Sequence, residues 1–288
     1  MDLLFSGVTI VTMDEAMHVY FDAYLGVTGT KISYISKDPP TQAPQKIMDA
    51  TGMVLMPGLI NCHTHLALSL LRGYAEDCGL SRWLSDCVLP REDRMDPRAA
   101  RAGVLLSLAE CIRFGITSVS DLYPFPEVTA QAVAEVGLKA NIAPALTLFS
   151  DESEDFDFEK DPSCRKLQEL VDQWHGYDAG RICVDAGIHA PYTSHYKLWE
   201  PLSDYAGEKG LRMQVHLSET AGEEAESQDR CGLTTAQLLD CHRVFDVPAA
   251  AIHCIYLSRE DMSLLARQGV SAVHCPVSNL KLIDGIAP

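Results

Sequence analysis

The sequence predicts an α/β protein whose main part is a TIM-type (β/α)8 barrel without its eighth strand, preceded by a small β-rich segment. Three observations carry this prediction. After about residue 56, short apolar runs alternate with amphipathic helical patterns, as in stacked βα units with a parallel sheet. No Gly-rich phosphate turn follows the first of these runs, which argues against a doubly wound sheet. The 288 residues, 47% of them hydrophobic, suffice for a large core.

The first domain is expected to span residues 1–56. Its apolar residues fall in short alternating runs at residues 3–11, 24–27, 31–35 and 54–56, and glycines and prolines separate the runs. Alternation with a period of two is typical of half-buried strands. We therefore expect small antiparallel strands here.

The second domain is expected to span residues 57–288 and to contain seven strands, at residues 59–63, 116–120, 140–146, 182–189, 213–217, 251–255 and 270–274. A helix over residues 98–114 carries an apolar stripe of Val104, Leu105, Leu108 and Ile112 and stops at Gly115. Another helix begins at Ser258, where Asp261 three residues later forms a capping box. Because a closed barrel needs eight strands, we expect unpaired edges on the first and seventh strands and association into a homo-oligomer.

Charge and cysteine content limit the classes of binding partner and indicate the cellular location. With 23 Lys and Arg against 40 Asp and Glu, the formal charge of −17 argues against nucleic acid or a membrane surface and leaves a small-molecule substrate. The N-terminal MDLLFSGVTI has no basic region before an apolar stretch, so we expect no secretory signal and a cytoplasmic location. The ten cysteines form no CxxC pair and are expected to be free.

Six histidines fall at the ends of five predicted strands, the face on which barrel enzymes keep their sites. A period of two puts His63 and His65 on one side of an extended segment, a spacing suited to one cation. His216 is followed three residues later by Glu219, a carboxylate able to move protons. The others are His189, His253 and His274.

These residues lie in segments that together resemble the amidohydrolase superfamily, in particular its branch of methylthioadenosine/S-adenosylhomocysteine deaminases and triazine hydrolases. The segments are PGLINCHTHLALSLLRGYAED, GITSVSDLY, GIHAPYT, VHLSET, AIHC and HCPVSNLKLIDGIAP. The resemblance implies a (β/α)8 barrel, a composite β-sandwich begun by residues 1–56, and one divalent metal ion, with zinc expected. It assigns the metal to His63, His65 and His216, the proton shuttle to Glu219 and the orientation of water to His253.

The resemblance further implies substrate contacts from Glu92 and His189, to which we add His274 and Asn279 after the seventh strand. The family's fourth metal ligand, an aspartate of the eighth strand, is not found in these 288 residues, and Asp121 is the first other acid to test. The family's two-metal enzymes carry a carboxylated lysine at the end of strand four, where this chain has His189, which favours one metal. Arginines that meet a substrate carboxylate in the nucleoside deaminases are missing from residues 144–149.

The resulting hypothesis is a hydrolytic deaminase of a heteroaromatic or nucleoside-like amine. Neutral imidazoles leave the cation's charge on its open position, which would lower the pKa of a bound water and supply hydroxide for the attack. Two alternatives stay open. One is a triazine-type chlorohydrolase or another C–N hydrolase on the same site, and the other is a truncated fragment without activity.

Overall fold

The computed structural model describes residues 1–75, 78–149 and 153–288 and divides the chain into two compact units, Met1–Leu59 and Ile60–Pro288. Their boundary lies close to residue 56, where the sequence places it. Glu76 and Asp77, which end the first motif quoted above, lie outside the described residues.

The first unit is one five-stranded sheet in which β3 (Lys31–Ser36), β2 (Val19–Thr28), β1 (Leu3–Val11) and β4 (Lys46–Asp49) lie in that order and β5 (Val54–Leu55) also pairs with β1. The four predicted strands are confirmed as β1, β2, β3 and β5, whereas β4 was not predicted. The antiparallel prediction is wrong for β5, which runs parallel to β1, as β4 does. The connection before β4 carries the chain back along the sheet instead of closing a hairpin. All four residues of β4 are exposed, so the strand lacks the alternation of buried and exposed residues on which the other predictions rest.

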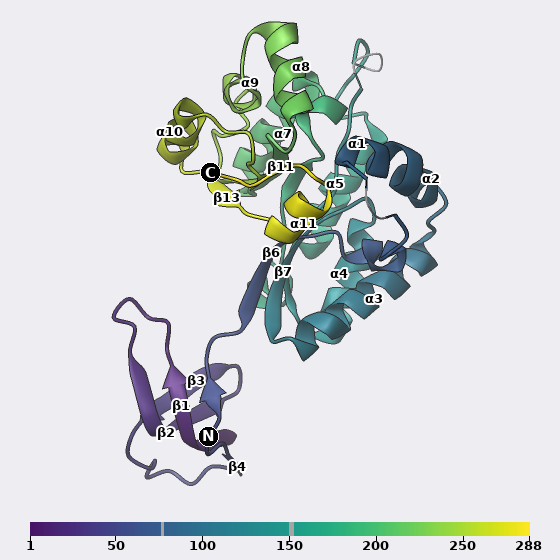
Figure 1. The fold of residues 1–288 in the computed structure, drawn as a ribbon. Helices are drawn as coiled ribbons and strands as arrows, with labels where there is room; N and C mark the ends of the chain where they lie inside the picture. The colour runs from purple at the N-terminus through teal and green to yellow at the C-terminus, as the bar shows by residue number, and fades with distance from the viewer. Residues whose placement is uncertain (76–77, 150–152) are drawn as a thin grey trace. The chain divides into compact units, whose positions relative to one another are not determined.

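In the second unit the predicted strands are confirmed, and the fourth is divided in two at Asp185. One sheet has the order β6 (Leu59–Thr64), β7 (Ile116–Leu122), β8 (Lys139–Ala143) and β9 (Ile182–Val184). The other has the order β10 (Ala186–Ile188), β11 (Met213–Leu217), β12 (Ala249–His253) and β13 (Ser271–Val273), and its neighbouring strands are parallel. Figure 1 shows the longer helices outside these strands, the arrangement of a TIM-barrel-type α/β fold.

The helical elements follow the strands in the order that the alternating pattern predicts. They are η1 (Leu66–Leu71), α1 (Leu80–Arg82), η2 (Trp83–Val88), α2 (Leu89–Glu92), α3 (Pro97–Arg113), α4 (Pro126–Val136), α5 (Pro162–Trp174), α6 (Tyr177–Gly180), η4 (Pro191–Thr193), α7 (Tyr196–Lys209), α8 (Ala221–Cys231), α9 (Thr235–Cys241), α10 (Arg259–Gln268) and α11 (Pro276–Lys281). Within the described part of the chain, no helix combines the length and the apolar character needed to cross a membrane.

Two predicted helices can be compared in detail. The α3 helix is confirmed, but the predicted stripe is wrong at Ile112, which is 54% exposed, because Cys111 takes the buried position of that turn. The capping box of α10 is confirmed, since Ser258 and Asp261 each accept a hydrogen bond from the other's backbone N–H. All ten cysteines are free, as predicted.

A buried polar cluster, here called the Asp185 network, joins strands inside the second unit. Asp185, 1% exposed, accepts hydrogen bonds from Gln214 Nε2 (2.7 Å), Arg212 Nη2 (2.8 Å) and Asn141 Nδ2 (3.2 Å). The carboxylate also raises the pKa of the Arg212 guanidinium through a hydrogen bond and its charge. The network ties β8 and β11 to the residue between β9 and β10 through donors on both oxygens of the Asp185 carboxylate, while Gln214 Oε1 is buried without a partner among the described residues.

Candidate active site

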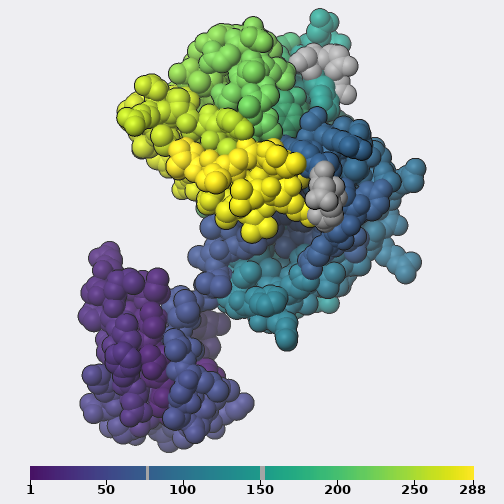
Figure 2. All heavy atoms as spheres, in the orientation of Figure 1, coloured from purple at the N-terminus to yellow at the C-terminus, as the bar shows by residue number. Residues whose placement is uncertain are grey.

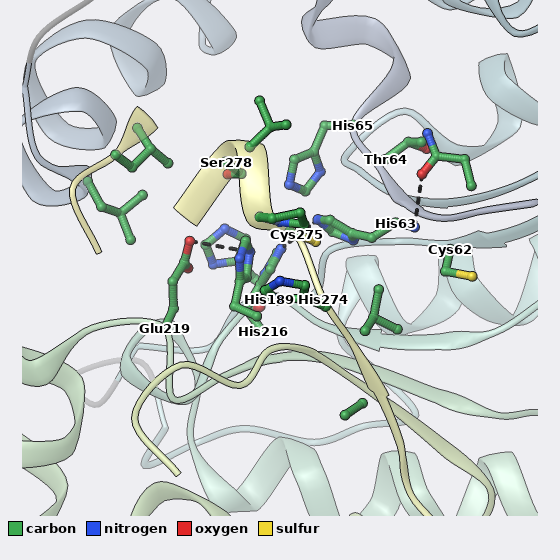
Figure 3. Close-up of a pocket in the computed structure, with 18 of the residues that line it drawn as sticks. Cys62, His63, Thr64, His65, His189, His216, Glu219, His274, Cys275 and Ser278 are labelled. Atoms are coloured by element: carbon green, nitrogen blue, oxygen red, sulfur yellow. Dashed lines mark hydrogen bonds and ion pairs between the residues drawn. The ribbon is translucent and has the colours of Figure 1, made fainter. Parts of the chain in front are cut away.

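Five histidines from the ends of four strands converge in the second unit, and we call them the histidine cluster: His63, His65, His189, His216 and His253. The His63 ring lies 4.7 Å from the His65 ring and 5.0 Å from the His216 ring, between centroids. The His189 and His253 rings lie 5.3 Å and 5.4 Å from that of His216. Figure 3 shows the gathered rings beside Glu219. The parallel strands bring these residues together because their carboxyl ends share one edge of the sheet.

Hydrogen bonds fix which ring nitrogen carries the proton. Nδ1 of His65 lies 2.6 Å from the Leu122 carbonyl oxygen, and Nδ1 of His216 lies 2.5 Å from the His189 carbonyl oxygen. A carbonyl only accepts, so each Nδ1 must donate, and in the neutral ring Nε2 keeps its lone pair. Such anchoring of Nδ1 is the usual support of metal-binding histidines.

The same reasoning applies to His189, whose Nδ1 lies 2.8 Å from Thr193 Oγ1. The Thr193 hydroxyl donates its hydrogen to the Ala190 carbonyl oxygen at 3.1 Å, so it accepts from the ring. Nε2 of His189 therefore also keeps its lone pair.

Burial keeps the cluster uncharged. It lowers the pKa of both His65 and His189 to about 4, and burial with neighbouring histidines holds the pKa of His63 and His216 well below the ordinary value. Burial also lowers the pKa of His253. Neutral imidazoles are the form that binds a cation. The Nε2 atoms of His63 and His216 face each other at 3.3 Å, and ligand atoms of His63, His216 and His253 all lie within 4.8 Å of one another.

Glu219 is the acid of the site. It is 4% exposed, and its Oε1 lies 3.3 Å from His253 Nε2. Burial, with the nearby charges of Asp284 and Glu223, raises the pKa of Glu219 to about 8. A buried carboxyl with a pKa near neutrality can both give and take a proton at the pH of the cell.

A cavity of about 780 Å³ opens beside the cluster. The sequence-predicted residues His63, His65, His189, His216, Glu219, His253 and His274 line it, together with residues that sequence reasoning did not select, among them Trp83, Tyr192, Cys275 and Leu282. A Cβ added to Gly79 would lie 3.7 Å from the Leu282 carbonyl oxygen, so the segment after α11 lies against the start of α1. Figure 2 shows that C-terminal segment in yellow beside the blue residues near position 80.

Three residues selected from the sequence are not among the described residues that line the cavity. Glu92 accepts a hydrogen bond from the Tyr123 hydroxyl at 2.6 Å. Asn279, 1% exposed, accepts a hydrogen bond from His253 Nδ1 at 2.8 Å. Asp121 uses Oδ1 for Leu66 N (2.7 Å) and Oδ2 for the Thr129 hydroxyl (3.2 Å). Asp121 therefore supports the segment that carries His65, and the candidate metal-binding group found among the described residues does not include it.

Comparison with known proteins decides the family. The family model described as the amidohydrolase family matches residues 54–288. The chain belongs to the amidohydrolase family. It is 35% identical over its whole length to a 5-methylthioadenosine/S-adenosylhomocysteine deaminase of Pelotomaculum thermopropionicum and 36% identical to one of Thermoanaerobacter pseudethanolicus. It spans 65% and 66% of the length of these two amidohydrolases.

Solved amidohydrolase structures agree with the fold. An adenosine deaminase from Xanthomonas campestris with bound zinc is 31% identical, with a TM-score of 0.89 over 100% of this chain and 65% of that one. An atrazine chlorohydrolase from Arthrobacter aurescens complexed with zinc is 23% identical, with a TM-score of 0.89 over 99% of this chain and 68% of that one. Zinc is bound in both relatives, and this chain carries a candidate histidine group for such an ion.

Proposed function

We propose that the protein holds one divalent cation, zinc, through His63, His65 and His216 and removes the amino group of a heteroaromatic, nucleoside-like substrate by hydrolysis. The observation that carries this proposal is the juxtaposition of neutral imidazoles, with Nε2 lone pairs directed inward, and the buried acid Glu219 in one cavity. Family membership supports the reaction type, and the relatives' names supply the substrate class.

The donor set fits such an ion. His65 and His216 present Nε2 because their Nδ1 atoms donate to carbonyl oxygens, and His63 Nε2 lies next to that of His216. We exclude His253 from the ligands because its Nε2 is paired with Glu219. Zinc takes imidazole nitrogen readily. A cation bound here would supply Lewis acidity and lower the pKa of water in the cavity.

Glu219 then moves the protons. With a pKa of about 8, it can take a proton from water, deliver it to a ring nitrogen of the substrate and protonate the departing amine. His253 receives or returns a proton through its contact with Glu219 Oε1, because Asn279 fixes the hydrogen on Nδ1. His189 and His274 face the substrate from the cavity wall. Glu92 and Asn279 act from behind it, through Tyr123 and His253.

The cavity wall favours an uncharged substrate. Among the described residues that line it, none is Lys or Arg, and apolar side chains such as Leu80, Trp83 and Leu84 offer a surface for an aromatic ring. A substrate carboxylate would meet no cationic side chain there, while the buried Asp284 lies close enough to Glu219 for its charge to raise the Glu219 pKa. We therefore expect methylthioadenosine and adenosine to be better substrates than S-adenosylhomocysteine.

The test is ammonia release from these three compounds by zinc-loaded protein. We expect turnover of the uncharged pair and a loss of about 10²- to 10⁴-fold in kcat for Glu219→Gln with zinc retained. Glu226→Gln, an exposed change of the same kind on α8, is the matched control. No turnover of any of the three compounds would reject the deaminase proposal, and a Glu219→Gln variant as active as Glu226→Gln would reject the shuttle.

We also propose that one further parallel strand completes the barrel between β6 and β13 and that further strands complete the sandwich of the first unit. β6 and β13 each stand at one end of their sheet's order, and Ile60 on β6 is 68% exposed. Without that strand, unpaired edges of this kind would promote association, and we expect a homo-oligomer only of the 288-residue chain by itself. An acid on the added strand would be the fourth ligand.

A further inference from the structure

Glu223 is a buried carboxylate in the third position of α8 that the proposed chemistry does not use. It is 6% exposed. Its Oε1 accepts a hydrogen bond from the backbone N–H of Ser218 at 3.0 Å, and its Oε2 accepts one from the N–H of Glu219 at 2.8 Å. Its own N–H donates to Thr220 Oγ1 at 3.0 Å, which closes the first turn of the helix around it. Both oxygens are therefore committed to the backbone just after β11.

Glu223 hydrogen-bonds to a segment whose backbone conformation is intrinsically unfavourable. Ser218 has a φ of 50°, in the left-handed region that residues with a Cβ seldom adopt. The Ser218 carbonyl oxygen accepts hydrogen bonds from the N–H groups of Ile255 and Tyr256, at 2.9 Å each. His253 and Cys254, which start the turn leading to these residues, also have positive φ, of 73° and 53°. The turns after β11 and β12 are thus hydrogen-bonded to each other.

We propose that Glu223 is a positioning residue that sets the places of Glu219 and, through the Ser218 carbonyl, of the turn that carries His253. The inference rests on the proposed function, in which these two side chains exchange protons. Two adjacent backbone N–H groups each need an acceptor, and the two oxygens of the Glu223 carboxylate accept one hydrogen bond each. Proton transfer depends on this placement, because a displacement of about 1 Å can cost about 10²-fold in rate.

The first experiment compares zinc-loaded Glu223→Gln, Glu223→Ala and the control Glu226→Gln. Glutamine offers one acceptor and turns an N–H donor toward the second backbone N–H, whereas alanine offers neither acceptor. We expect kcat to fall about 10- to 100-fold in Glu223→Gln and further in Glu223→Ala, with KM changed less than about 2-fold and zinc per chain unchanged. Equal kcat in Glu223→Gln and Glu226→Gln, or a loss of kcat that follows a loss of zinc, would overturn the positioning role.

The second experiment separates this inference from the proposed reaction. Hydrogen exchange of the Ser218 and Glu219 amides reports the two hydrogen bonds whatever the protein catalyses. We expect exchange to be at least about 10-fold faster than in wild type at one of these amides in Glu223→Gln and at both in Glu223→Ala, and unchanged in Glu226→Gln. Wild-type exchange rates in Glu223→Gln would refute the inference. If that acceleration is seen in a protein inactive on all three compounds, the proposed function fails while the backbone role of Glu223 stands.

Discussion

The Asp185 network and the histidine cluster are both buried polar groups of the second unit, yet they are built in opposite ways. In the Asp185 network, donors from Asn141, Arg212 and Gln214 surround one acceptor carboxylate. In the histidine cluster, Nδ1 of His65 and of His216 is bonded to a backbone carbonyl oxygen, Nδ1 of His63 is buried without a partner among the described residues, and the Nε2 atoms of His63 and His216 face each other. The Asp185 carboxylate finds its donors within the chain, although Gln214 Oε1 is buried without a partner among the described residues, whereas the cluster leaves Nε2 lone pairs without donors.

This difference separates a structural cluster from a functional one. A buried polar group that finds its partners within the protein contributes to the fold, and a buried acceptor set without donors costs free energy unless a ligand completes it. Burial alone does not distinguish the two clusters, because Asp185 is 1% exposed and His216 is 4% exposed. The presence of donors around the Asp185 carboxylate, and their absence around the facing Nε2 atoms of His63 and His216, distinguish them. Changes in the two clusters should therefore have different effects on stability and on metal content.

The largest effect is expected for His216→Asn. It removes an inward Nε2 lone pair, so zinc binding should weaken by more than about 10²-fold, since even the outer partners of metal ligands contribute about 10- to 100-fold. The metal-free variant should keep most of its stability, because no donor inside the chain depends on that nitrogen except through His63. Zinc per chain, measured by elemental analysis after dialysis, checks this against His18→Asn in the first unit.

Two outcomes would contradict the mononuclear site. One is retention of zinc by His216→Asn, and the other is two tightly bound ions per wild-type chain.

Asp185→Asn should have the opposite effects, a loss of stability with zinc binding retained. The added amide turns a donor toward the donors of Gln214, Asn141 and Arg212. Breaking a buried ion pair costs about 3–5 kcal/mol, and because the Arg212 side chain is 48% exposed we expect about 2–4 kcal/mol of lost stability. Urea unfolding followed by the fluorescence of Trp174 and Trp199 measures this loss. Asp204→Asn, in an exposed pair with Arg243, is the control and should leave the midpoint unchanged. Loss of zinc in Asp185→Asn would show that the two clusters are coupled.

Much of this architecture could be predicted from the sequence. The strands of the second unit have apolar runs of the right length, and strand ends in a βα repeat share one face, so the convergence of His63, His216 and His253 followed from their positions. The division of the fourth strand at Asp185 was not predictable, because it depends on pairing with two different neighbours, β9 with β8 and β10 with β11.

Residues that act through another residue were the hardest to place. Asn279 follows the seventh strand and was expected to touch substrate, but it lies behind His253. Glu223 falls in a helix-start pattern, Thr220 followed three residues later by a glutamate, that ordinarily indicates a capping box. Its carboxylate instead reaches the N–H groups of Ser218 and Glu219. These contacts arise from the turn geometry after β11 and β12, which no periodic pattern encodes.

Asn279 combines one paired and one unpaired polar atom, and its replacement is expected to have the smallest effect on stability and activity. Its Oδ1 is matched to His253 Nδ1, while its buried Nδ2 has no partner within the described part of the chain. Asn279→Ala removes one hydrogen bond and one unpaired donor together, so the free energy of unfolding should change by less than about 1 kcal/mol. The His253 ring, however, loses the acceptor that holds its hydrogen on Nδ1, and its tautomers should then mix. We expect about 10-fold lower kcat with zinc retained, and nitrogen NMR of the imidazole should show the second tautomer. If His253 keeps a single tautomer in Asn279→Ala, then the unmatched histidine cluster sets its own protonation and Asn279 belongs with the structural residues.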